Sequence, residues 1–220
     1  YWSHCVSYRT RTEHFTPGIV DADGVRQIAR EVGEKGFTAL KTNIFHYDDE
    51  DRIEGWSPGF SRPHEPGRNV ERKTRRDLRK HLEIMREAAG PDIDILLDLN
   101  FNGKTEGFLS MLREIEDLDI FWVEIDTLDP KALAYIRSQS RHPISSCETL
   151  IGLQQFLPFF REQAVDVAII DTPWNGVWQS LKIAAAAEAY EVNVASHNFY
   201  GHLCTMMNAH FSAVVPNMRI

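Results

Sequence analysis

Short apolar runs alternate with amphipathic segments along most of the chain. The run that ends in "LKTN" at residues 40–43 is typical of a buried strand. A helix is predicted over 74–89, because Leu78, Leu82 and Met85 recur there at helical spacing and Gly90 follows. The same order then repeats. Further strands are predicted over 93–100, 119–125, 142–148, 165–171 and 192–196, and further helices over 105–118, 130–139, 152–163, 177–190 and 201–213.

Strands that alternate with helices at this pace indicate a parallel sheet and an α/β fold. With "YWSHC" (1–5) as the first strand and "NMRI" (217–220) as the last, the chain has seven strands and the start of an eighth. That number predicts a TIM-type (β/α) barrel. A doubly wound sheet is the alternative, but the glycine-rich phosphate loop that usually follows an early strand of that fold is not found.

The chain is interpreted as one barrel domain over residues 1–220. It begins and stops within apolar stretches, so we expect it to be a portion of a longer protein that ends before the last strand is complete. Residues 46–70 have no clear periodicity and many Pro and Gly residues, which favours a functional lid or an ordered insertion.

Composition and charge exclude some classes of partner. With 32 acidic and 24 basic residues and a net charge of -8, the chain is not expected to bind nucleic acid. The basic cluster over 71–81 is interpreted as the solvated face of the 74–89 helix. No apolar run is long enough to cross a bilayer, so no membrane partner is expected. Three cysteines without paired spacing favour a reduced, cytoplasmic protein.

Polar and charged side chains gather where the predicted strands end, and these ends carry the chemistry of a barrel. They are Lys41, Asn43, Asp98, Asn100, Glu124, Glu148, Asp171 and His197. From Asp98 onward the charged members recur every 23 to 26 residues, so each takes the same place on the next strand. Carboxylates that converge in this way require a cation, and an all-oxygen ligand set favours Mg²⁺, with Mn²⁺ as the alternative. Taken singly, Glu148 or Asp171 could instead cap the helix that follows it.

Asp171 and His197 end neighbouring predicted strands. A carboxylate beside an imidazole orients the ring and raises its basicity. We therefore expect His197 to act as a general acid/base, with Asp171 as the residue that orients it.

These residues and their surroundings resemble the enolase superfamily, and within it the mandelate racemase/muconate lactonizing enzyme group. The resemblance covers essentially the whole chain and rests on the segments "LKTN", "LLDLN", "FWVEI", "SSCETL", "DVAIIDTPWNG" and "ASHNFYG". It implies a (β/α)₇β barrel, normally covered by an N-terminal α+β capping domain that is absent from this chain. It also implies a small-molecule carboxylate substrate and a homo-oligomer, either a dimer or an octamer.

The resemblance assigns Asp98, Glu124 and Glu148 as ligands of an essential Mg²⁺, and Asp171 with His197 as a His–Asp pair. Such members use a Lys or His base to remove the proton α to a carboxylate, and they form a metal-stabilised enediolate. If the substrate carries a β-hydroxyl, the hydroxyl is expelled and a 2-keto-3-deoxy acid forms. This implies a lyase that dehydrates an acid sugar.

Two positions differ from the family pattern. Many members have Lys-x-Lys at the second strand, whereas this chain has Lys41-Thr42-Asn43, and an amide cannot remove a proton at neutral pH. Some dehydratases use a histidine on the third strand as the acid, and Asn100 takes that place here. Asn43 and Asn100 are therefore expected to bind substrate.

Lys41 is expected to contact the substrate carboxylate or a hydroxyl, although it could instead pair with a carboxylate ligand. With one base, dehydration is favoured over racemisation. A racemase, epimerase or cycloisomerase, and a metal-binding member without acid-sugar activity, remain alternatives.

Overall fold

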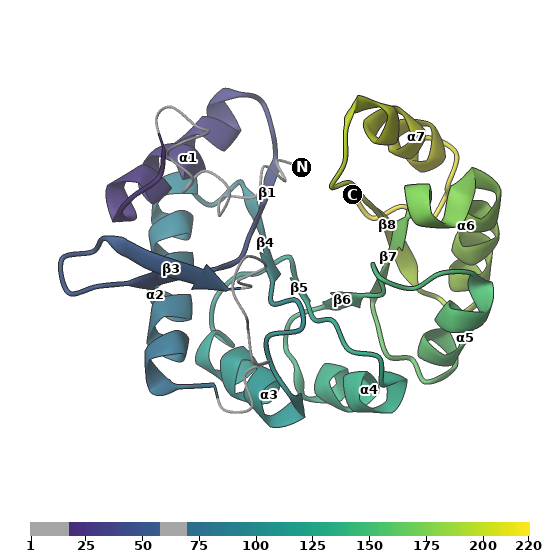
Figure 1. Ribbon diagram of the computed structural model, residues 1–220, viewed down its shortest axis with the longest axis horizontal. Helices are drawn as coiled ribbons and strands as arrows, with labels where there is room; N and C mark the ends of the chain where they lie inside the picture. Colours follow the sequence, from purple (N-terminus) through teal and green to yellow (C-terminus); the bar gives the residue numbers. More distant parts are fainter. Residues whose placement is uncertain (1–17, 58–69) are drawn as a thin grey trace. The chain divides into compact units, whose positions relative to one another are not determined.

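The computed structural model describes residues 18–57 and 70–220, which fall into two compact units (Figure 1). The first unit runs to Glu124 and includes Ser140–His142, and the second comprises Ile125–Gln139 and Pro143–Ile220. The predicted strand over 1–5 and residues 58–69 of the predicted lid lie outside the described residues.

In its described residues, the first unit has three parallel strands, a hairpin and three helices. In chain order these are α1 (Ala22–Glu34), β1 (Ala39–Thr42), β2 (Ile44–Tyr47), β3 (Ile53–Ser57), α2 (Arg72–Ala89), β4 (Asp94–Asp98), α3 (Thr105–Glu114) and β5 (Trp122–Glu124). β4 pairs in parallel with both β1 and β5, whereas β2 and β3 pair with each other in antiparallel fashion.

The second unit continues the strand–helix order. Its elements are α4 (Pro130–Gln139), β6 (Ile144–Ser146), α5 (Leu153–Arg161), β7 (Val167–Asp171), α6 (Thr172–Ala189), β8 (Asn193–His197) and α7 (His202–Ser212). β7 pairs in parallel with β6 and β8. Met218 forms a parallel bridge with Val194 of β8, so the "NMRI" segment begins to extend this pairing. The predicted α/β class with parallel strands is confirmed, and closure into a full barrel stays a prediction.

The apolar pattern explains where the helices pack. In α2, Leu78, Leu82 and Met85 are all fully buried, as their spacing predicts. Gly90 ends this helix with a φ of 81°, a conformation that costs glycine little. α4 begins as predicted, because the side chain of Asp129 accepts hydrogen bonds from the backbone N–H groups of residues 131 and 132.

Two elements of the first unit were not predicted. α1 buries an apolar stripe that includes Val25, Ile28 and Val32, and it packs against α2. Part of the segment predicted as a lid forms the hairpin of β2 and β3, which packs on α2 (Figure 1). Its turn is held by Asp48, whose side chain accepts hydrogen bonds from the N–H groups of residues 50 and 52.

The strands carry many of the buried apolar residues of each unit. Ile95, Leu96 and Leu97 of β4 are fully buried, and every residue of β7 is buried. Strands buried on both faces are typical of parallel sheets covered by helices. Among the residues that the structure describes, no helix combines the length and the apolar character needed to cross a membrane.

Candidate active site

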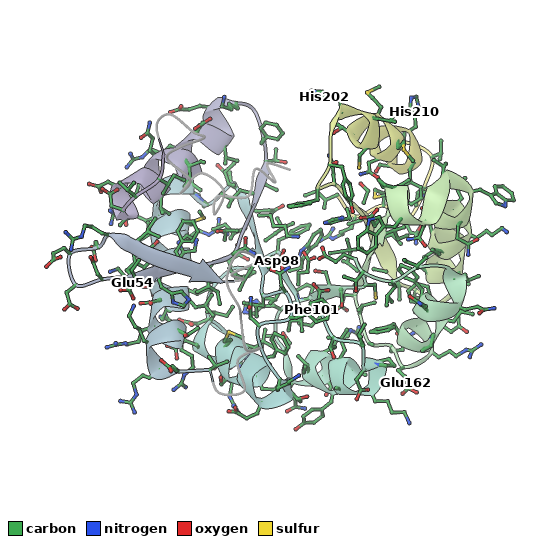
Figure 2. The ribbon with its side chains drawn as sticks, viewed as in Figure 1. Glu54, Asp98, Phe101, Glu162, His202 and His210 are labelled. Carbon is green, nitrogen blue, oxygen red and sulfur yellow. The ribbon has the colours of Figure 1, made fainter. Side chains whose placement is uncertain are left out.

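The carboxyl ends of β4 and β5 place two acidic side chains next to each other in the first unit. Asp98 and Glu124 are register partners, and Asp98 ends β4 (Figure 2). Glu124 has no exposed surface and Asp98 is 7% exposed. Two buried carboxylates at neighbouring positions require a positive charge nearby.

Lys41 of β1 supplies such a charge. Its Nζ lies 3.0 Å from Oδ2 of Asp98, and it also forms an ion pair with Oε2 of Glu124. The sequence left open whether Lys41 meets the substrate or pairs with carboxylate ligands. The structure shows ion pairs with both carboxylates, and contact with the substrate stays a prediction. The ion pairs also show that the oxygens of Asp98 and Glu124 face a cation. Buried, all-oxygen donors of this kind fit Mg²⁺.

Asn43 and Asn100 form part of the framework around Asp98. Nδ2 of Asn43 donates to the backbone oxygen of Asp98 at 3.1 Å and to Oδ1 of Asn100 at 3.3 Å. The N–H of Asn100 donates to Oδ1 of Asp98 at 2.9 Å, with Asn100 at a φ of 44°. Both side chains are buried, and it is the backbone N–H of Asn100 that orients the Asp98 carboxylate, while the Asn43 amide holds the backbone of Asp98. Their predicted contact with substrate stays a prediction.

A buried histidine lies behind the end of β1. His81 of α2 lies 2.8 Å from Oγ1 of Thr42 through Nε2, and 2.8 Å from the hydroxyl of Tyr47 through Nδ1. Burial, and the nearby His46, lower the pKa of His81 to about 3. A neutral ring can donate through one nitrogen and accept through the other, which matches two hydroxyl partners. His81 was not singled out from the sequence, although it follows Leu78 by three residues on the buried stripe of α2.

In the second unit, Asp171 and His197 are register partners at the ends of β7 and β8. Nδ1 of His197 lies 2.8 Å from Oδ2 of Asp171. Oδ1 of Asp171 accepts the N–H of Trp174 at 3.0 Å, so this aspartate also caps α6. Capping and ring orientation, which the sequence presented as alternatives, are therefore both performed by Asp171.

Glu148 lies on the other side of the imidazole. Its Oε2 is 3.3 Å from Nε2 of His197, and its side chain is 15% exposed. Glu148 follows Cys147, whose φ of 90° turns the chain sharply after β6. Gly152 is the N-cap of α5, so Glu148 does not cap the helix that follows it. The structure thus brings Glu148, Asp171 and His197 together within one unit.

Two aromatic residues that were not singled out from the sequence follow β8. The hydroxyl of Tyr200 donates to Oδ2 of Asp171 at 2.9 Å, and the ring meets that of His197 edge-on. The ring of Phe199 lies nearly parallel to that of His197, with an interplanar angle of 14° and centroids 6.3 Å apart. His202 and His210, by contrast, are exposed on α7 (Figure 2).

Parallel strands with acidic side chains and a His–Asp pair at their carboxyl ends are typical of α/β enzymes that bind a metal and transfer protons. The model of the "Enolase C-terminal domain-like" family matches residues 23–220, so the chain belongs to this family. The resemblance to the enolase superfamily is thereby confirmed.

Relatives of the chain catalyse more than one reaction. D-gluconate dehydratase from Thermoproteus tenax is 26% identical over 204 residues, which is 91% of this chain and 37% of that protein. N-succinyl-L-Arg/Lys racemase from Bacillus cereus is 31% identical over 174 residues, which is 77% of this chain and 40% of that protein.

A solved structure is more similar in sequence. It is that of a proposed L-alanine-DL-glutamate epimerase from Burkholderia xenovorans strain LB400, bound to magnesium and fumarate. The identity is 59% and the TM-score is 0.94, over 100% of this chain and 55% of that one. The chain thus spans about half the length, or less, of the relatives described above.

Proposed function

We propose that the intact protein is a Mg²⁺-dependent lyase that dehydrates an acid sugar to a 2-keto-3-deoxy acid. The observation that carries this proposal is the arrangement of His197 between Asp171 and Glu148, at 2.8 Å and 3.3 Å. An imidazole held by a carboxylate on one nitrogen can exchange a proton through the other. Its second nitrogen faces a residue that we assign to the metal.

His197 would act first as a base and then as an acid. Nδ1 carries a proton, because the Asp171 carboxylate can only accept, and this leaves Nε2 to take the proton from the α-carbon. The imidazolium then returns a proton to the β-hydroxyl, which leaves as water. Atoms and charges balance without another group, and the product enol tautomerises to the keto acid.

The metal ligands in this proposal are Asp98, Glu124 and Glu148. Mg²⁺ bound there would stabilise the negative charge that develops on the substrate carboxylate when the α-proton is removed. Lys41 keeps the buried carboxylates neutralised and contacts the substrate carboxylate. Asn43 and Asn100 orient Asp98 and present amides to the substrate hydroxyls.

Racemisation or epimerisation is the second candidate, and the 59% identity to a proposed epimerase supports it. A two-base reaction requires a second base opposite His197. Asn43 cannot serve, and Lys41 would first have to release Asp98 and Glu124. One-base dehydration is therefore preferred over epimerisation, over cycloisomerisation and over a metal-binding role without turnover.

Solvent exchange separates these functions. The intact protein with Mg²⁺ is incubated in D₂O with sugar acids and, separately, with amino-acid derivatives and dipeptides. Keto-acid formation from a sugar acid, with deuterium at C3 of the product after tautomerisation in D₂O, is the expected result. Exchange at the α-carbon with inversion but no keto acid would support the epimerase, and neither keto acid nor exchange with any acid would contradict both reactions.

The first prediction concerns His197. Replacing it by asparagine removes the base, so turnover should fall at least about 10³-fold, as for loss of a general base. Mg²⁺ affinity, measured by calorimetry, should be kept. The matched control is His202→Asn, which changes an exposed histidine of the same unit and should leave turnover unaltered. Full activity of His197→Asn would remove His197 from the mechanism.

A further inference from the structure

We infer that Tyr200 is a positioning residue of the active site, because its hydroxyl fixes the carboxylate of Asp171 and thereby the ring of His197. This inference rests on the proposed function, in which His197 transfers the proton. No feature of the sequence pattern singles out Tyr200, which lies in the loop between β8 and α7.

Three donors converge on the carboxylate of Asp171, whose side chain is only 1% exposed. Oδ1 accepts the N–H of Trp174 at 3.0 Å. Oδ2 accepts from the Tyr200 hydroxyl at 2.9 Å and lies 2.8 Å from Nδ1 of His197. An ionised carboxylate only accepts, so both the hydroxyl and Nδ1 must supply hydrogens. The contacts therefore define which ring nitrogen of His197 carries the proton toward Asp171.

The two oxygens of Asp171 have different anchors. The bond from Trp174 holds Oδ1 to the first turn of α6, but a single hydrogen bond restrains rotation about the Cβ–Cγ bond less than bonds at both oxygens do. The Tyr200 hydroxyl is the second anchor, and it holds Oδ2 where Nδ1 of His197 meets it. A carboxylate fixed at both oxygens keeps Oδ2 in one orientation toward the imidazole. The His–Asp pair is then preorganised for proton transfer.

The Tyr200 ring restrains His197 directly as well. The two rings meet edge-on at an interplanar angle of 86°, with centroids 6.1 Å apart. Phe199 lies nearly parallel to His197, so two consecutive aromatic residues contact the imidazole in different directions. Aromatic pairs prefer such edge-on or offset arrangements.

The loop that carries Tyr200 is itself held in place. Nδ2 of Asn208 on α7 donates to the backbone oxygen of His197 at 2.6 Å, and Nδ2 of Asn198 donates to the hydroxyl of Thr205 at 3.1 Å. α7 is thus tied to the last residue of β8 and to the first residue of the loop. Burial and the neighbouring Asp171 raise the pKa of Tyr200, so the hydroxyl keeps its proton and remains a donor at neutral pH.

The test variant is Tyr200→Phe, which removes the hydroxyl and keeps the ring contacts. In the intact, Mg²⁺-loaded protein, kcat should fall about tenfold, as expected for loss of one hydrogen bond to a charged group, with KM and Mg²⁺ affinity unchanged. The matched control is Tyr135→Phe, because Tyr135 is exposed on α4, and it should leave kcat unchanged.

A second measurement does not require turnover. In protein labelled with ¹⁵N-histidine, the Nδ1–H signal of His197 is assigned by its loss in His197→Asn. Its exchange with water should be about tenfold faster in Tyr200→Phe, because an anchored Nδ1–H···Oδ2 bond opens less often. Exchange should be unaltered in Tyr135→Phe.

The outcomes separate the two proposals. If the wild-type protein forms no keto acid but the Nδ1–H signal of Tyr200→Phe exchanges faster, the proposed reaction fails and the positioning role stands. An unaltered Nδ1–H exchange rate in Tyr200→Phe overturns the positioning role, whatever the activity. A lower melting temperature with unaltered kcat and exchange would show that Tyr200 is only structural.

Discussion

Buried polar side chains around β1 and β7 form hydrogen bonds with residues of other elements. These partners determine which atoms of each side chain donate and which accept. Asp171 illustrates this, because one oxygen caps α6 while the other faces His197. His81 is the corresponding case in the first unit, where α2 presents it to hydroxyls of β1 and β2. The two histidines differ in that His197 faces carboxylates and His81 faces only neutral hydroxyls through its ring nitrogens.

His81 predicts a pH dependence of stability. Its folded-state pKa is about 3, below the unfolded value near 6.5, so acid protonates the unfolded chain first. The stability that neutral His81 provides is present above about pH 6.5 and is lost as the pH falls toward 3. The contribution reaches about 1.4 kcal/mol per pH unit, or about 2 kcal/mol between pH 6.5 and about pH 5.

The measurement compares His81→Gln with the wild-type protein by urea unfolding across this range. Glutamine can meet both hydroxyls but does not titrate, so its unfolding free energy should decline less steeply on acidification. His210→Gln, which changes an exposed histidine of α7, should follow the wild-type curve. If His81→Gln and the wild type lose stability equally on acidification, His81 is not the source of the pH dependence.

At the scale of elements, the kink in α6 fixes the first turn that contacts Asp171. Gly176 has a φ of 70° and a ψ of 151° inside the helix, which separates residues 172–175 from the regular turns that follow. Asn175 in this first turn donates to the backbone oxygens of Leu150 and Asp171. The glycine therefore lets the first turn of α6 contact Asp171 while the rest of the helix runs in a different direction.

Gly176→Ala should destabilise the protein by about 1–2 kcal/mol, because an L-residue is strained at this positive φ. The expected loss is purely conformational, since an added Cβ meets no atom within 4 Å. Gly201→Ala is the matched control, because it too has open space for a Cβ, but its φ is -79°. Urea unfolding of both variants provides the comparison, and equal losses would contradict the strain argument.

Most strands and helices could be predicted from the sequence, because buried strands and helix stripes leave a periodic apolar pattern. That Asp98 lies beside Glu124, and Asp171 beside His197, could be predicted because neighbouring parallel strands share a register. α1 was not predicted, although the sequence contains its apolar stripe and also Asp21, whose side chain caps the helix.

Other features could not be predicted, because tertiary contacts produce them. The β2–β3 hairpin lacks a clean alternating pattern, and it rests on α2 through contacts such as that of Lys73 with the backbone oxygen of Tyr47. Tyr200 reaches Asp171 only through the path of a loop, which has no period. The partners of Lys41 could not be predicted either, because they depend on which oxygens lie near its ammonium group in the folded chain.

At the scale of the whole molecule, the proposed Mg²⁺ site predicts that stability depends on the ion. If Asp98, Glu124 and Glu148 hold one Mg²⁺, its binding stabilises the folded protein by RT ln(1 + [Mg²⁺]/Kd), about 2.7 kcal/mol at a hundredfold excess over Kd. A chelator should therefore lower the melting temperature of the intact protein.

A double-mutant cycle tests whether Asp98 and Glu148 bind the same ion. Asp98→Asn and Glu148→Gln should each weaken Mg²⁺ affinity in calorimetry, and the double variant should lose less than the sum, with a coupling of about 1 kcal/mol or more. The control pair combines Asp98→Asn with Glu162→Gln, because Glu162 is exposed at the end of α5 (Figure 2). That pair should be additive within about 0.5 kcal/mol. Additivity of Asp98→Asn with Glu148→Gln would mean that the two carboxylates do not bind the same ion, because ligands of one ion cannot lose affinity independently.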